Sequence, residues 1–174
     1  MKTQSSSDKP LTKAAVIWTI IGCLILAGGI PGFIKFQKHR REINAITAEQ
    51  AYQAARTGNV ARLKWILDRR PDLINQPGNS YGSTALHAAV WFSQPLAVKE
   101  LLRQKADVNA PNDYGITPLH DCAQKGTAEI ALILLDHGAD VTLRNRAGKT
   151  PLQVAIDYNH PDIAEVLRQH GAKE

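Results

Sequence analysis

Residues 116–120 read I-T-P-L-H, and two related stretches lie at a constant distance on either side. S-T-A-L-H occupies residues 83–87, and K-T-P-L-Q occupies residues 149–153. The same step of 33 residues relates three further sets of identical residues: Asn79, Asn112 and Asn145; Gly82, Gly115 and Gly148; Leu86, Leu119 and Leu152. A fixed period of this length indicates an array of stacked units, each of which buries its apolar face only against its neighbours.

The middle repeat contains the signals that begin and end two short helices. Thr117 is a suitable N-cap, and Pro118 occupies the first helical position, where a missing N–H costs nothing. We therefore predict a turn over residues 112–115 and a first helix over residues 118–125 that ends at Gly126. A second helix is indicated by apolar residues at helical spacing, namely Ile130, Ile133 and Leu134.

The T-P-L-H stretch at a period of 33 resembles the ankyrin repeat, whose hallmark is T-P-L-H-x-A. Three units carry the Thr and Leu, although Gln153 replaces His in one and Ala85 replaces Pro in another. The resemblance implies an all-α solenoid of about four helix–turn–helix units, with short hairpin loops that project to one side. The predicted units are residues 45–78, 79–111, 112–144 and 145–174.

The first of these units is degenerate. It lacks the Thr-Pro start, and its register is shifted by two residues, although Gly58 stands in the position of Gly126. Such a departure is expected of a terminal repeat, because one of its sides faces water.

An apolar run without a charged side chain extends over 21 residues, from Ala14 to Ile34. An α-helix of that length spans about 31 Å, close to the ~30 Å hydrocarbon core of a bilayer. We therefore predict a single transmembrane helix over residues 14–34, between a polar tail (residues 1–13) and a basic linker (residues 35–44). Its regular part is expected to stop near Ile30, because glycines and Pro31 follow.

Two alternatives for this run stay open. Residues 27–29 (A-G-G) offer a weak site for removal of a signal peptide. Residues 20–23 (I-I-G-C) resemble the signal of bacterial lipoproteins, in which the cysteine is lipidated, although apolar residues continue after Cys23.

The net charge of +5 belongs to the N-terminal segment. Residues 1–42 contain seven of the 21 Lys and Arg residues and two of the 16 acidic residues, which leaves 14 of each sign in residues 43–174. No basic face of the folded domain is indicated, so we expect no nucleic-acid partner. Basic residues are slightly more concentrated after the apolar run than before it, which favours a cytoplasmic repeat domain and leaves an extracytoplasmic one open.

The consecutive residues His120, Asp121 and Cys122 suggest an active site at first sight. On a helix their side chains point about 100° apart and do not converge on one substrate or metal. His120 recurs as His87 one repeat earlier, and the resemblance implies that both brace the loop and the capping Thr. Cys122 aligns with Ala89 and Ala155, so we expect a small buried residue. We predict no enzyme activity, no cofactor, no metal site and no small-molecule substrate.

The resemblance implies that a protein partner binds to the concave face, which hairpin loops and exposed first-helix positions form. The predicted partner-binding residues are Tyr81, Trp91, Phe92, Tyr114, Asp121, Gln124, Lys125, Asp157 and Tyr158. Asp121, which aligns with Ala88 and Val154, is expected to face this side. The alternative for Trp91 and Phe92 is packing against a neighbouring repeat. Trp65 is expected in the core.

Together these features predict a membrane-tethered protein–protein interaction scaffold whose partner is a protein of unknown identity. The alternative is an exported or lipid-anchored ankyrin protein that supports an enzyme or the envelope outside the cytoplasm. The side of the membrane that holds the repeat domain distinguishes the two.

Overall fold

The computed structural model describes residues 31–173, and within that range it contains helices, turns and hairpin loops but no β-strand. Helix α2 (Pro31–Asn44) belongs to one compact unit, and all later helices belong to a second unit that begins at Ala45. The all-α fold class predicted from the sequence is confirmed for the described part of the chain.

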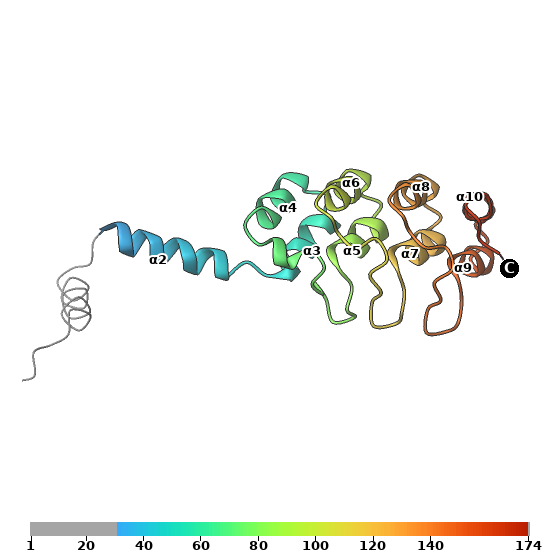
Figure 1. The fold of residues 1–174 in the computed structure, drawn as a ribbon, viewed down its shortest axis with the longest axis horizontal. Coiled ribbons are helices and arrows are strands. Elements are labelled where there is room, and N and C mark those ends of the chain that lie inside the picture. The colour runs from blue at the N-terminus through green and yellow to red at the C-terminus, as the bar shows by residue number, and fades with distance from the viewer. Residues whose placement is uncertain (1–30, 174) are drawn as a thin grey trace, which may run out of the picture. The chain divides into compact units, whose positions relative to one another are not determined.

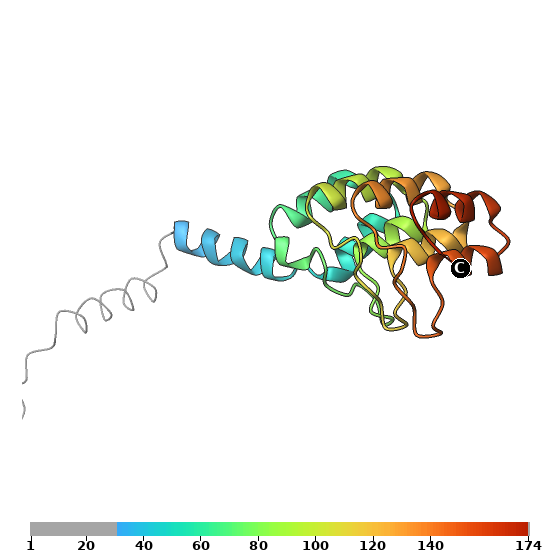
Figure 2. The same ribbon diagram turned by 45° about the vertical axis from the view of Figure 1, so that its right-hand side comes forward.

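The second unit consists of four helix pairs. They are α3 (Ala48–Arg56) with α4 (Val60–Leu67), α5 (Ala85–Trp91) with α6 (Pro95–Arg103), α7 (Pro118–Lys125) with α8 (Ala128–Asp136), and α9 (Pro151–Asp157) with α10 (Pro161–Gln169). A short 3₁₀ helix, η1 (Pro71–Leu73), follows α4. The first helices of the pairs form one row, the second helices form another, and the hairpin loops project beyond the first row (Figure 1). We call these rows the inner and outer helices; Figure 2 shows them from a second direction.

Helix α7 begins and ends as its sequence predicts. Thr117 is the N-cap of α7 and Pro118 its first residue, and the helix ends at Gly126 with a left-handed φ of 78°. The equivalent positions also have positive φ, and they are occupied by Gly58, Ser93 and Asn159. Gly58 precedes Ser93 by 35 residues rather than 33, which is the two-residue shift expected of the first unit.

The core runs the length of the solenoid as rows of equivalent residues. Leu86, Leu119 and Leu152 of the inner helices are at most 1% exposed. Leu101, Leu134 and Leu167 of the outer helices are fully buried, and each such side chain contributes about 1.5–3 kcal/mol through burial. Where inner helices meet, the small residues Ala89, Cys122 and Ala155 are all inaccessible to solvent, as predicted.

Each hairpin is closed by one asparagine side chain. The Oδ1 atom of Asn112 accepts hydrogen bonds from the backbone amides of Tyr114 (2.9 Å) and Ile116 (3.1 Å). Asn79 and Asn145 make the same pair of bonds in their own hairpins. This repeated contact explains why asparagine recurs at a step of 33 residues.

Backbone hydrogen bonds join neighbouring hairpins. The amide of Asp113 donates to the carbonyl of Tyr81 (3.0 Å), and the amide of Arg146 donates to the carbonyl of Tyr114 (2.9 Å). The three hairpins therefore keep a fixed spacing, which sets the distance between the side chains that they present.

The expectation that Trp65 lies in the core is wrong. Leu63, Ile66 and Leu67 fill the buried face of α4, and Trp65 points away from that face with 38% of its surface exposed. Its ring is covered by the guanidinium groups of Arg62 and Arg69, each 4.3 Å from the ring centroid.

Most of the predicted membrane segment, residues 14–30, lies outside the described residues, as does the polar tail. Residues 31–34 of that segment and the predicted basic linker (residues 35–44) are helical and form α2, which has Pro31 as its first residue. Within residues 31–173 no helix combines the length and the apolar character needed to cross a bilayer.

Candidate partner-binding groove

A groove of about 390 Å³ lies between inner helices α5 and α7 and the two hairpins that precede them. We call it the aromatic groove. Its lining residues are Tyr52, Asn79, Tyr81, Ser83, His87, Trp91, Phe92, Asn112, Tyr114, Ile116, Asp121 and Gln124. A larger depression of about 700 Å³ lies over α3 and the start of α4, and it contains none of the residues predicted to bind a partner.

The walls of the groove are formed by aromatic side chains that remain open to solvent. Tyr81 and Tyr114 occupy equivalent places in successive hairpins, and their ring centroids are 6.3 Å apart with a tilt of 37°. Tyr81 is 57% exposed and Trp91, at the end of α5, is 36% exposed. Phe92 and Tyr114 are also exposed. Such rings supply a large apolar surface with few rotatable bonds, as interface anchors do.

Cations from the neighbouring inner helices lie over two of these rings. The guanidinium of Arg56 is 4.7 Å from the centroid of Phe92, and Lys125 Nζ is 5.0 Å from the centroid of Trp91. Trp91 and Phe92 thus contact neighbouring repeats, as the alternative interpretation had it, while they remain more than one third exposed. This placement is as expected, because the π-face of an aromatic ring attracts positive charge.

Asp121 lies much deeper in the groove than the sequence suggested. It is only 6% exposed, so it is not a carboxylate presented on the surface, although it does line the groove. Burial raises the pKa of its carboxyl group to about 8. The aligned residues Ala88 and Val154 are buried as well, so that only this repeat places a titratable group at this position.

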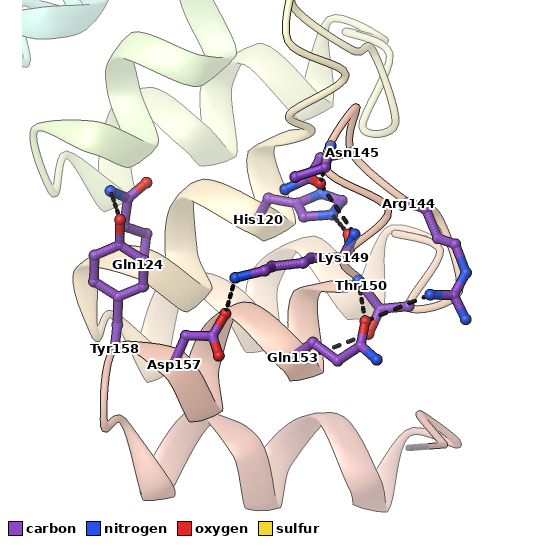
Figure 3. Close-up of polar contacts among 10 residues, drawn as sticks. His120, Gln124, Arg144, Asn145, Lys149, Thr150, Gln153, Asp157 and Tyr158 are labelled. Atoms are coloured by element: carbon purple, nitrogen blue, oxygen red, sulfur yellow. Dashed lines mark hydrogen bonds and ion pairs between the residues drawn. The ribbon is translucent and has the colours of Figure 1, made fainter.

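A second, smaller hollow of about 220 Å³ adjoins the aromatic groove on the far side of Gln124. In it Gln124 Nε2 donates to the hydroxyl of Tyr158 (2.9 Å), and Lys149 Nζ pairs with Asp157 Oδ2 at 2.6 Å (Figure 3). The hydrogen bond from Lys149 to Asp157 raises the pKa of the lysine. Gln124, Asp157 and Tyr158 are therefore already engaged with other residues.

The structure gathers all the predicted partner-binding residues on this face. Tyr81, Trp91, Phe92, Tyr114 and Asp121 line the aromatic groove, Asp157 and Tyr158 line the smaller hollow, Gln124 lines both, and Lys125 covers Trp91. Sequence reasoning missed Tyr52, whose hydroxyl accepts a hydrogen bond from Asn79 Nδ2 (3.2 Å), and Lys149. Tyr52 precedes Arg56 by four residues on α3. This spacing places both side chains on the same face of the helix and could have indicated that Tyr52 lies beside the groove.

The two inner-helix histidines are engaged in holding the repeats together. His120 Nδ1 accepts from the amide of Thr117 (3.3 Å), and Nε2 donates to the carbonyl of Lys149 in the next unit (3.0 Å). His87 bonds Thr84 and the carbonyl of Ile116 in the same way. Burial lowers the pKa of both imidazoles, which favours the neutral form that this pattern requires.

Cys122 has the properties of a packing residue. It is inaccessible to solvent, and burial raises the pKa of its thiol to about 12. A nucleophilic cysteine needs the thiolate form and access to a substrate, and Cys122 has neither. Within residues 31–173 no group of three or more His, Cys, Asp or Glu side chains is arranged to hold a metal ion.

The family profile described as "Ankyrin repeats (3 copies)" matches residues 32–112 and 93–174. This chain belongs to the ankyrin-repeat family. A search of curated proteins gave no match. Ankyrin repeats are in general protein–protein interaction modules and are typically not catalytic, and the solenoid presents an extended surface for that purpose. Within the described residues, the aromatic groove brings together the four exposed rings of Tyr81, Trp91, Phe92 and Tyr114.

Proposed function

We propose that this ankyrin protein is a membrane-tethered interaction scaffold whose aromatic groove holds a segment of a partner protein. The observation that carries the proposal is the set of four exposed rings, Tyr81, Trp91, Phe92 and Tyr114, around one hollow. Clusters of exposed aromatic side chains near a concave surface are the usual location of binding hot spots. Exposure of four large rings on one face is otherwise unfavourable for a soluble domain.

Binding rather than catalysis is supported by the state of the reactive side chains. His87 and His120 are engaged at both ring nitrogens, and the thiol of Cys122 is buried and protonated at neutral pH. A protein partner rather than a nucleic acid is supported by the balanced charge of residues 43–174. The proposed function requires no cofactor and no small-molecule substrate.

Tethering to the membrane is supported by the uncharged run Ala14–Ile34, whose length suits a bilayer. The basic residues that follow it favour a cytoplasmic repeat domain. A reporter enzyme that is active on only one side of the membrane, fused after Glu174, tests this topology. Activity of a reporter that works only outside the cytoplasm would show the opposite orientation. Loss of membrane association in a Cys23→Ser variant would instead favour the exported, lipid-anchored alternative that residues 20–23 suggest.

Site-specific photo-crosslinking tests the groove. A photoreactive amino acid at position 91 is expected to form a covalent adduct with a protein partner in native membranes. The matched control is position 65, which also holds an exposed tryptophan but lies on outer helix α4, away from the groove. Trp91→Ala combined with Tyr114→Ala is expected to abolish co-purification of the same partner, whereas Trp65→Ala leaves it intact. Equal adducts at positions 65 and 91 would refute the groove as the binding site.

A further inference from the structure

The carboxylate of Asp121 is a buried acidic group without a partner. Among the described residues none donates a hydrogen bond to it or pairs with it, and burial alone accounts for the raised pKa. A buried, unpaired carboxylate destabilises a fold, and the aligned Ala88 and Val154 show that this position accepts an apolar side chain. The repeat therefore retains a costly group at the one place where it lines the aromatic groove.

The ionisable groups around Asp121 offer no partner to its ionised form. On its own helix, Cys122 is protonated and Lys125 lies over the ring of Trp91. From α5, the imidazole of His87 is neutral and bonded to Thr84 and Ile116.

The other elements that face the groove add no free cation. From α3, Tyr52 contributes a phenol ring and Arg56 lies over the ring of Phe92. The hairpin residues Tyr81 and Tyr114 contribute phenol rings. From the side of α9, Asp157 is itself acidic and is paired with Lys149. Among the described residues the cations near the groove are therefore engaged with a ring or with Asp157, and none is paired with Asp121.

The aromatic walls of the groove are also suited to a positively charged ligand. Aromatic faces attract ammonium and guanidinium groups, and two of the rings here, Trp91 and Phe92, already carry a cation of the protein itself. Tyr81 and Tyr114 stand side by side above the groove with more than half of each residue exposed. A carboxylate at the base of a groove with aromatic walls is the arrangement that recognises a long cationic side chain.

We propose that the aromatic groove takes one lysine or arginine side chain of the partner protein, which pairs with Asp121 and stacks against the tyrosine rings. This inference rests on the proposed function, because it specifies the chemistry of the segment that the groove holds. The aliphatic part of the side chain fits the aromatic walls, and its charged end reaches the carboxylate.

Binding of a cation in this position is coupled to loss of a proton. With a pKa of about 8, Asp121 is mostly protonated at pH 7 in the free protein. An incoming ammonium or guanidinium favours the ionised carboxylate, so that the proton is released on binding. Release is expected to approach about one proton per ligand near pH 7 and to vanish well above pH 8.

The test uses short peptides and the full chain in detergent micelles. Ac-Gly-Lys-Gly-NH₂ and its arginine counterpart are compared with the norleucine peptide, which has a similar length and no charge. The indole resonance of Trp91 reports binding, and calorimetry in phosphate and Tris, buffers of different ionisation enthalpy, reports proton release. The cationic peptides are expected to bind at least about tenfold more tightly than the norleucine peptide.

Asp121→Asn is expected to remove both the preference and the proton release, and Asp121→Val, which copies the fourth repeat, gives the same result. Asp157→Asn, which changes an exposed carboxylate in the adjoining hollow, is expected to leave both intact. Equal affinity for the lysine and norleucine peptides, or a preference that survives in Asp121→Asn, overturns the inference.

The outcome is separable from that of the proposed function. If the adduct at position 91 persists undiminished in Asp121→Asn, the groove binds a partner but not through a basic side chain. If no adduct forms at position 91 while the peptides still show the preference, the recognition chemistry holds and the proposed scaffold function fails.

Discussion

His120 Nε2 donates a hydrogen bond to the backbone carbonyl of Lys149, 3.0 Å away in the next repeat. The histidine thus links two consecutive repeats through a hydrogen bond between residues 29 positions apart. Gln153, in the same position of the last unit, accepts from the amide of Thr150 (3.0 Å) and from Arg144 Nη1 (3.4 Å), but among the described residues its side chain donates to no backbone carbonyl of another repeat. A comparison of His120 with Gln153 therefore distinguishes two contributions of this position. Both residues cap their own helix through the threonine amide, and only His120 also bonds the backbone carbonyl of the next repeat.

His120→Gln is expected to keep the local bond to Thr117 and to lose the bond to Lys149. The free energy of unfolding should fall by about 0.5–1.5 kcal/mol, because the carbonyl of Lys149 loses its donor in a partly buried hydrogen bond. Urea unfolding followed by circular dichroism measures the change. His137→Gln is the matched control, since His137 bonds only Ile133 of its own helix and is exposed. A similar loss in both variants would contradict the role of His120 between repeats.

Replacement of Asp121 by Asn is expected to stabilise the fold in a pH-dependent way. The pKa of Asp121 is raised from 3.8 in the unfolded chain to about 8 in the folded one, so between these values the folded state holds a proton that the unfolded state has lost. Wild-type stability therefore falls as pH rises from about 4 to about 8, by at most about 1.4 kcal/mol per pH unit.

The measurement is the difference in unfolding free energy between Asp121→Asn and wild type at several pH values. The buried histidines contribute equally to both proteins and cancel. The advantage of the variant should grow up to about pH 8 and then remain constant. Parallel curves over this range would show that the carboxyl group titrates normally.

Cys122 is expected to resist thiol reagents until the domain unfolds. Its thiol is inaccessible, and its pKa of about 12 leaves almost no thiolate at pH 8. Labelling with Ellman's reagent in a Cys23→Ser background should follow the rate of unfolding as urea is added. Rapid labelling without denaturant would indicate an accessible and reactive cysteine.

Gly126→Ala is expected to destabilise the fold more than Gly138→Ala. Both glycines have a left-handed φ, which costs a residue with a side chain about 1–2 kcal/mol. A Cβ atom at Gly126 would in addition lie 2.8 Å from Cε1 of His160, whereas at Gly138 it would meet nothing within 4 Å. Thermal unfolding of the two variants isolates this steric term. Equal losses of stability would mean that His160 moves aside freely.

The sequence was most informative where structure is decided locally. The caps at Thr117 and Pro118, the helix end at Gly126 and the packing role of Cys122 depend on neighbours in the chain or on comparison between repeats. Trp65 was misplaced because its neighbours are buried, whereas a helix turns by about 100° per residue and directs position 65 outward.

Contacts between segments that are distant in the sequence could not be predicted from neighbouring residues or from comparison between repeats. Asp121 shares its groove with rings from two separate hairpins, and the bond between Gln124 and Tyr158 joins residues 34 positions apart. Spacing predicted which residues share a face, but not how deeply each is covered or which side chains pair with one another.

The bonds that fix the spacing of the hairpins, from Asp113 to Tyr81 and from Arg146 to Tyr114, use only main-chain atoms. The phenol rings at positions 81 and 114 take no part in them. Support of the hairpins and the recognition that we propose thus reside in different atoms of the same two residues. Under the proposed function, variation of these side chains alone redirects the protein to a new partner while the scaffold stays unaltered.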